Sequence, residues 1–384
     1  MVDRMVDRMV DRTVDRPLTL LHTADLHLGM AFPGLGERGR EHREQLRRTF
    51  ARIVEVALER RVDLLVVAGD LFHSPRQGEG TIAFVRDQFR RLGEGGVRVA
   101  LVAGNHDPFV EESVWTRGRF QEAPHVHLFG PAPEAVTYPD LDLTVVGQSV
   151  GPDGAAGLAA WPRRPTTTRF AVGVAHGSAY REGMVEDGPI HPADIRALGL
   201  DYLALGDWHS PSQVTGPPTP AWYAGAPEFL AMDQEGGQVL LVTIPAPGAA
   251  TVEAVPVGRR RYRRRQVDVT GLDPAQVQTD LLAEADPDTV LDVVLTGLAP
   301  PGAGPDPRAL EDALQEVCFR ARVRDARRPL LDEATLEAFP ERTLVGRFIR
   351  EMRRRADAAP QEEREVIEEA LQLGVALLLH PEDV

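Results

Sequence analysis

The strongest constraint on the fold is the apolar run at 62–68, which leads directly into Gly69 and Asp70. A short run rich in Val and Leu and closed by glycine is typical of a strand covered on both faces in a layered α/β domain. Gly69 lets the backbone turn sharply and leaves Asp70 at the carboxyl end of the strand, where open α/β sheets bind ligands. An aspartate after a strand is more often a turn residue, so Asp70 gains meaning only from similar loops elsewhere.

Four further strand-like runs also lead into polar loops. The pattern predicts these strands at 18–22, 97–102, 170–175 and 202–205, with amphipathic helices at 41–60 and 81–92. The loops carry carboxylate, imidazole and amide groups, namely Asp25, His27, Asp70, Asn105, His106, Asp107, His176, Asp207 and His209. Such repetition indicates a site assembled from neighbouring strand ends.

Carboxylate, imidazole and amide groups are the ligands that borderline divalent ions such as manganese, iron or zinc prefer. The spacing of Asp25 and His27 lets both side chains of an extended segment point the same way. A carboxylate such as Asp70 can bridge two ions a little under ~4 Å apart, the arrangement that activates a hydroxide for in-line attack on phosphorus. The sequence therefore predicts a metal site for phosphoryl chemistry.

The motifs, taken together, resemble those of calcineurin-like metallophosphoesterases in order and spacing. They read Asp25-x-His27, Gly69-Asp70, Gly104-Asn105-His106-Asp107, His176 and Gly206-Asp207-Trp208-His209. The Gly-Asp-Leu-Phe-His run at 69–73, with a small domain and a helical tail behind the catalytic domain, is similar to SbcD-like (YhaO-like) DNA repair exonucleases. The resemblance implies an α/β fold: a four-layer metallophosphoesterase β-sandwich flanked by helices, then a small α+β capping domain and a C-terminal helical tail.

The resemblance also implies a role for each site residue. One metal would be held by Asp25, His27, Asp70 and His209, and a second by Asp70, Asn105, His176 and Asp207. His106, paired with Asp107, would face the scissile phosphate and protonate the leaving oxygen or stabilise the transition state. His73 would contact substrate rather than metal. The two ions are expected to be Mn²⁺, with Fe²⁺, Zn²⁺ or Mg²⁺ as alternatives.

The sequence departs from the family pattern at Asp207, where a histidine is usual. Because carboxylate binds manganese well, we expect a working but altered second site, and a weak or empty one is the alternative. Trp208 beside it could stack on a nucleobase, but we expect a buried aromatic residue that supports its loop.

The chain is expected to divide into four parts. Residues 1–16 repeat Met-Val-Asp-Arg and read as a disordered extension, 17–257 as the nuclease domain, 258–340 as the capping or DNA-binding domain, and 341–384 as a helical tail. Behind the nuclease domain the pattern predicts strands at 267–269, 290–295 and 319–324, and helices at 274–285, 307–317, 344–355 and 361–379. The arginines around Tyr262 would either grip phosphates or form a solvated linker strand.

Charge and composition limit the partners. The net charge of −15 argues against a surface that coats nucleic acid everywhere, but not against a nuclease with a local basic patch and bound metal. All 43 basic residues are Arg, which reads first as a genome-composition effect. No apolar run reaches the roughly 18 residues needed to span a bilayer, and the single cysteine, Cys318, reads as a buried apolar residue. We expect a cytoplasmic protein with no membrane contact.

The resemblance implies DNA as the substrate, and a DNA repair exonuclease of 3′ to 5′ polarity with endonuclease activity on single strands. It also implies that the tail docks on an SMC-like ATPase (SbcC-like), with packing against the chain's own domain as the alternative, and a homodimer is typical of the family. Two other functions stay open. The chain would be a phosphodiesterase or phosphatase on small substrates, or a weakly active structural subunit of an ATPase complex.

Overall fold

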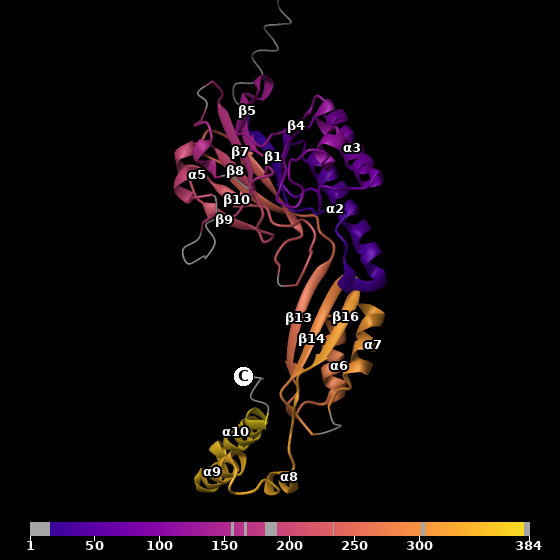
Figure 1. Ribbon diagram of the computed structural model, residues 1–384, viewed down its shortest axis with the longest axis vertical. Helices are drawn as coiled ribbons and strands as arrows, with labels where there is room; N and C mark the ends of the chain where they lie inside the picture. The colour runs from indigo at the N-terminus through magenta and orange to yellow at the C-terminus, as the bar shows by residue number, and fades with distance from the viewer. Residues whose placement is uncertain are drawn as a thin grey trace, which may run out of the picture. The chain divides into compact units, whose positions relative to one another are not determined.

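The computed structural model describes residues 16–154, 157–164, 167–180, 190–232, 234–300 and 304–379. The chain forms two units, unit 1 at 1–260 and unit 2 at 261–384 (Figure 1). The predicted extension at 1–16 lies outside the described residues except for Arg16, whose guanidinium donates to the Asp63 carboxylate. Among the described residues we find no helix with the length and apolarity that a membrane crossing requires.

The first sheet of unit 1 has six strands in the order β12-β11-β1-β2-β3-β4. Its strands are β1 (Leu18–Thr23), β2 (Leu64–Ala68), β3 (Arg98–Val102), β4 (Val126–Leu128), β11 (Gln238–Ile244) and β12 (Thr251–Pro256). Strands β1 to β4 are parallel, whereas β11 pairs antiparallel with both β1 and β12. The parallel part is buried on both faces, as its uninterrupted apolar runs require.

The second sheet of unit 1 also has six strands, in the order β5-β6-β7-β8-β10-β9. They are β5 (Glu134–Tyr138), β6 (Leu143–Gln148), β7 (Phe170–His176), β8 (Tyr202–Gly206), β9 (Ser212–Thr215) and β10 (Ala221–Tyr223). Strands β6, β7, β8 and β10 run parallel, and the edge strands β5 and β9 are antiparallel to their neighbours. The strand ends that carry His176 and Asp207 therefore point the same way.

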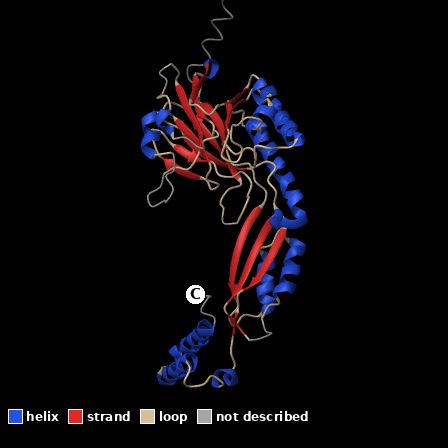
Figure 2. Cartoon of the chain, in the orientation of Figure 1, coloured by secondary structure: helices blue, strands red, loops and turns tan. Residues whose placement is uncertain are grey.

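The two sheets pack face to face around a buried cluster that draws Leu20 and Val66 from the first sheet and Val145 and Val172 from the second. Helices α2 (Gly39–Glu59) and α3 (Glu79–Glu94) lie on the outer side of the first sheet, and α5 (Pro192–Leu198) covers the second (Figures 1 and 2). The apolar stripe of α2 and the matching stripe of α3 are buried, as their helical spacing predicts. The predicted four-layer sandwich is confirmed.

One polar pair crosses the interface between the sheets. His22 of β1 and Tyr202 of β8 are both fully buried. His22 Nε2 lies 3.2 Å from the Leu205 carbonyl oxygen, which can only accept, so Nε2 carries the proton and Nδ1 accepts from the Tyr202 hydroxyl at 2.9 Å. Burial lowers the pKa of His22 to about 3. The pair is thus satisfied only while the imidazole is neutral.

Unit 2 begins with a parallel three-stranded sheet in the order β13-β14-β16. Its elements are β13 (Arg261–Asp268), α6 (Pro274–Ala283), β14 (Thr289–Thr296), α7 (Pro307–Val317) and β16 (Arg320–Asp325). Asp273 and Asp306 cap α6 and α7 through their carboxylates, each before a first-turn proline, as predicted. Cys318 is buried in the core of this unit, which confirms its expected role as a small apolar residue.

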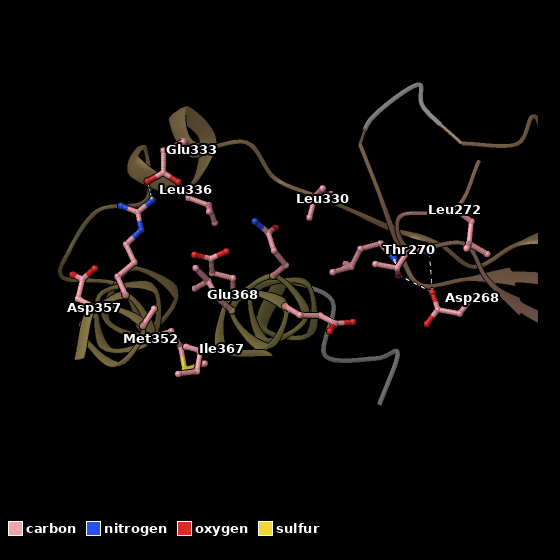
Figure 3. A pocket seen from close by; sticks show the side chains of 16 residues that line it. Asp268, Thr270, Leu272, Leu330, Glu333, Leu336, Met352, Asp357, Ile367 and Glu368 are labelled. Atoms are coloured by element: carbon pink, nitrogen blue, oxygen red, sulfur yellow. Dashed lines mark hydrogen bonds and ion pairs between the residues drawn. The ribbon is translucent and has the colours of Figure 1, made fainter. Parts of the chain in front are cut away.

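The remaining part of unit 2 is helical after the short β15 (Leu298–Ala299) and β17 (Arg328–Pro329) ladder. Helices α8 (Glu333–Glu337), α9 (Leu344–Ala358) and α10 (Gln361–Leu379) share an apolar cluster that includes Leu336 and Ile349. A pocket of about 910 Å³ opens between these helices and the loop that follows β13 (Figure 3). None of the predicted site residues lines it.

The structure differs from the sequence prediction at the start of unit 2. The strand predicted at 267–269 begins at Arg261, so it includes most of the arginine run, whose side chains are largely exposed. Acidic residues distant in sequence compensate the charge, since Arg261 pairs with Asp286 and Arg265 with Glu284. These partners have no signal in the local sequence. The separate capping domain at 258–340 and tail at 341–384 remain predictions.

Candidate metal centre

The predicted site residues lie at the ends of five strands or on the loops that follow them, namely β1, β2 and β3 of the first sheet and β7 and β8 of the second. His176 is the last residue of β7, and the others lie in loops. Within each sheet these strands are parallel, so their carboxyl ends share one edge. Two hydrogen bonds join the edges: His176 Nδ1 to the Ala68 carbonyl oxygen at 2.9 Å, and the Asp207 amide to Asp25 Oδ1 at 3.1 Å. The candidate site is thus built across both sheets.

The backbone at this edge is unusual. Asp25, His27, Asp70 and Asp207 have φ values of 53°, 49°, 50° and 110°. Among the described residues only eight non-glycine positions have positive φ, so half of them are candidate ligands. Such conformations cost free energy and persist where the surrounding structure enforces them, often at functional sites. Here the His27 amide donates to the Asp70 carbonyl oxygen at 3.0 Å, which ties the two loops together.

Asp70 lies at the centre of the cluster and is buried. Its Oδ2 atom is 3.6 Å from His27 Nε2 and 3.7 Å from His176 Nε2. Two groups of side chains that share Asp25 have donor atoms close enough to hold a metal ion: Asp25 with His27 and His209, and Asp25 with Asp70 and His176. The groups adjoin one another and share Asp25, so they offer two neighbouring sites.

Asn105 and Asp207 extend the second group. Asn105 Oδ1 lies 3.0 Å from His176 Nε2, and Asp207 Oδ1 lies 3.8 Å from the same nitrogen. The Ser178 hydroxyl donates to Asp207 Oδ2 at 2.5 Å, which holds the carboxylate in place. The residue that departs from the family pattern therefore keeps an oxygen beside the second group.

His106 and Asp107 occupy different environments. The His106 ring is not buried, and its centroid lies 4.7 Å from that of His27. The main-chain amide of His106 donates to Asp70 Oδ1 at 2.9 Å. Asp107 is buried, and its carboxylate accepts from the amides of Phe72 at 2.9 Å and Gly104 at 2.7 Å. These bonds give Asp107 a supporting position in the loop, and its pairing with the His106 ring stays a prediction.

His73 was predicted to contact substrate, but its ring also lies close to the candidate metal ligand His27. Its Nδ1 atom is 3.3 Å from His27 Nδ1, and its ring stacks on His106 at 5.0 Å. His27, His73 and His106 form a third group whose nitrogens are close enough to hold a metal ion. The predicted substrate role of His73 remains a prediction, and the geometry adds a ligand role as an alternative.

The ionisation of the site follows from its burial. Burial raises the pKa of Asp25 to about 8 and that of Asp107 to about 7. It lowers the pKa of His27 to about 2, an effect that the neighbouring imidazoles reinforce. For His176 burial also acts to lower the pKa, but three nearby carboxylates outweigh it and the pKa rises. Buried carboxylates and neutral imidazoles together favour a bound cation.

The donor set fits divalent ions. His27 Nε2 and His209 Nε2 lie 3.1 Å apart, so a hydrogen bond between them needs a proton on one of the two nitrogens. A metal ion bound here would instead accept the lone pairs of both nitrogens. Mixed imidazole and carboxylate donors suit manganese, iron and zinc. The other ring nitrogen of His209 lies 2.9 Å from Gln234 Nε2, the kind of outer bond that fixes the orientation of a metal-binding histidine.

Two glycines are required by close approach. A Cβ on Gly104 would lie 2.1 Å from Asp70 Oδ1, and a Cβ on Gly206 would lie 1.9 Å from the Ala68 carbonyl oxygen. Both distances are shorter than real Cβ contacts. Gly104 therefore lets the loops after β2 and β3 approach each other within the first sheet, and Gly206 lets the end of β8 in the second sheet approach β2 in the first.

Sequence reasoning missed Gln234, Ser178 and the exposure of Trp208. Gln234 lies in a loop after β10 with no pattern around it, and Ser178 was visible only as a neighbour of His176. Trp208 was expected to be buried, but its side chain is 44 % exposed. The prediction was wrong because main-chain and carboxylate hydrogen bonds of Asp207 to Asp25 and Ser178 hold this loop without a buried aromatic side chain.

Together the sandwich and the Asp/His cluster at its edge define a metal-dependent phosphoesterase. The family model for calcineurin-like phosphoesterase matches residues 18–211, and the chain belongs to this family.

Three curated relatives are similar over much of the chain. The uncharacterized metallophosphoesterase YhaO of Bacillus subtilis is 28% identical over 66% of this chain and 64% of its own length. The DNA double-strand break repair protein Mre11 of Aeropyrum pernix is 31% identical over 65% of this chain and 63% of its own length. The SbcD component of the nuclease SbcCD of Rhodobacter capsulatus is 27% identical over 63% of this chain and 70% of its own length. The chain thus spans less than two thirds of the first two relatives.

Proposed function

We propose that this chain is a two-metal phosphodiesterase that hydrolyses phosphodiester bonds in DNA. The observation that carries the proposal is the position of Asp70, whose Oδ2 atom lies 3.6 Å from His27 and 3.7 Å from His176, residues of two adjoining donor groups. A carboxylate between two such groups is what a two-ion site for in-line displacement at phosphorus requires.

Each site residue then has a distinct role in the proposed reaction. Divalent ions held by Asp25, His27, Asp70, Asn105, His176, Asp207 and His209 would polarise the phosphate and supply a hydroxide nucleophile. His106 is not buried and its main chain is tied to Asp70, so it can donate a proton to the leaving oxygen. His73 stacks on His106 and would contact the substrate on the same side. Asp107 would keep the loop in shape through its two amide bonds.

Several finer assignments rest on the relatives. DNA as substrate is supported by the names of the Mre11 and SbcCD relatives. We extend the proposal to a 3′ to 5′ exonuclease with single-strand endonuclease activity, to manganese as the ion, and to a cytoplasmic location. The same proposal includes an SbcC-like ATPase partner that docks on the tail at 341–384. It also includes a capping domain at 258–340 and a homodimer.

The test is manganese-dependent cleavage of end-labelled linear duplex and single-stranded DNA. The purified chain should cut DNA only with added ion, and Asp70→Asn should abolish cleavage. Asp312→Asn, a change at an exposed carboxylate on α7, is the matched control and should leave cleavage unchanged.

The same samples separate the alternatives. Turnover of bis-p-nitrophenyl phosphate without DNA cleavage, lost in Asp70→Asn, would indicate an enzyme for small diesters. Absence of both activities, with one bound ion or none by elemental analysis, would favour a structural subunit.

A further inference from the structure

Two aromatic side chains stand out on the surface of unit 1. Among the described residues of this unit, Tyr180 and Trp208 are the large hydrophobic side chains that are exposed, at 38 % and 44 %. The others of this kind lie in unit 2, from Leu272 onward. Trp208 stands between the candidate ligands Asp207 and His209, and Tyr180 lies two residues beyond Ser178, which bonds Asp207. Trp208 thus borders the metal centre, and Tyr180 lies on the loop that follows the candidate ligand His176.

The loops that carry them are fastened to each other. The Gly177 amide donates to the Gly206 carbonyl oxygen at 3.1 Å, and Ser178 donates to Asp207 at 2.5 Å. The Tyr223 hydroxyl accepts from the Ala179 amide at 2.7 Å and donates to the Gly177 carbonyl oxygen at 2.8 Å. The loop that carries Tyr180 and the loop that carries Trp208 are therefore hydrogen-bonded to each other.

The Tyr180 ring is itself ordered by its neighbours. It stacks on His191, with ring centroids 5.2 Å apart and planes 29° apart, and its amide donates to the Ile190 carbonyl oxygen at 2.8 Å. Tyr180 can therefore offer a flat face without losing much further side-chain freedom on binding.

We propose that Trp208 and Tyr180 form a stacking platform for the bases of an unpaired strand next to the scissile phosphate. This inference rests on the proposed function, because it assumes that the phosphate of a nucleic acid lies at the metal centre. Aromatic faces bind single strands by stacking on bases of any sequence. The bases of a duplex are already stacked on one another, so the platform selects unpaired nucleotides at an end or in a single strand.

A protein partner is the alternative to a nucleic acid as the molecule that binds these exposed aromatic residues. Here the neighbours of Trp208 are the candidate ligands Asp207 and His209, so a partner seated on this ring would cover the mouth of the site. A substrate that places its phosphate on the ligands and its base on the ring uses both features at once.

The first test is a fluorescence titration in EDTA with a short oligothymidylate and with an abasic strand of the same length. Trp115 and Trp161 are buried and Trp222 is partly buried, so a quench by the strand should come mainly from Trp208. We expect saturable quenching by oligothymidylate and at least about tenfold weaker binding of the abasic strand. Equal binding of the two strands would overturn the proposal.

Variants separate stacking from folding. Trp208→Phe keeps an aromatic face, so it should keep affinity, followed by anisotropy of a labelled strand, while it loses the quench. Trp208→Leu should weaken binding about tenfold, and Tyr180→Leu should weaken it by a smaller factor. Val317→Ala, at an exposed residue of unit 2, is the control and should change nothing. Unchanged affinity in a folded Trp208→Leu, judged by circular dichroism, would refute the platform.

The outcome is independent of the nuclease test. Binding that depends on Trp208 in a protein that never cuts DNA would keep the platform and remove the nuclease. Metal-dependent cutting of base-bearing and abasic strands at equal rates would keep the nuclease and remove the platform.

Discussion

At the scale of single residues, the main question is whether Asp207 completes a second metal site. Its Oδ1 atom lies 3.8 Å from His176 Nε2 and its Oδ2 atom accepts from Ser178. We predict that the wild-type chain and Asp207→His bind two manganese ions, whereas Asp207→Ala binds one, as measured by elemental analysis after gel filtration. Two ions retained by Asp207→Ala would mean that Asp207 is not a ligand.

Gly104 provides a second prediction at this scale. Its replacement by alanine would put a Cβ 2.1 Å from Asp70 Oδ1 and push that carboxylate away. A displacement of this order costs about 10²-fold in kcat/KM, which a phosphodiester hydrolysis assay would detect. Gly80→Ala is the matched control, because Gly80 lies inside α3 with no atom near the added methyl group. It should leave activity intact and, by restricting the unfolded chain, stabilise the fold by roughly 0.4–1 kcal/mol.

The grouping of the candidate ligands was also the part of the site that sequence alone could predict. Each follows a strand-like run, and parallel strands bring their ends to one edge, so the grouping of Asp25, Asp70 and His176 follows from general rules. The bond from Gln234 to His209 could not be predicted, because it depends on a loop path with no periodic pattern.

At the scale of secondary-structure elements, strands β1 and β8 are joined by the bond between His22 and Tyr202. Tyr202→Phe would remove the donor and leave His22 Nδ1 buried without it. We expect a loss of about 1–3 kcal/mol in the free energy of unfolding, measured by urea denaturation at pH 7. A loss below about 0.5 kcal/mol would mean that water or a repacked neighbour replaces the hydroxyl.

The same imidazole predicts a pH dependence of stability. The folded-state pKa of His22 is about 3, below the unfolded value of 6.5, so the unfolded chain binds the proton more tightly. The contribution is therefore complete above pH 6.5 and is lost as the pH falls from 6.5 towards 3. Between pH 7 and pH 5 it amounts to about 2 kcal/mol. Denaturation of His22→Gln at both pH values should show a smaller difference than wild type.

The elements themselves were predicted unevenly. Long buried strands such as β2 and amphipathic helices such as α2 have strong periodic patterns, and the structure has them within a few residues of the predicted bounds. The short strands β9 and β10 and the arginine-rich β13 were missed or shortened. β9 and β10 pair with each other but are only four and three residues long, too short to show a periodic pattern. In β13 the arginine charge is compensated by distant residues, such as Asp286 for Arg261, which local sequence cannot reveal.

At the scale of the whole sandwich, candidate ligands from both sheets meet in one centre. Asp25 and Asp70 come from the first sheet and His176 and His209 from the second, so a bound ion would link the sheets. We predict that removing metal with EDTA lowers the Tm by roughly 5–10 °C, the shift expected from ions present at about 100 times their Kd. Differential scanning calorimetry would measure it, and Asp70→Asn should show no such shift.

The spread of the ligands along the chain has a consequence during synthesis. Asp25 is made early, but His209 and the inner strand β11, which separates β1 from β12, emerge much later. A growing polypeptide can therefore fold its early elements on the ribosome long before the candidate metal centre is complete. A translation product that stops short of His209 would lack one side of the candidate centre, so we expect it to bind metal more weakly than the full chain.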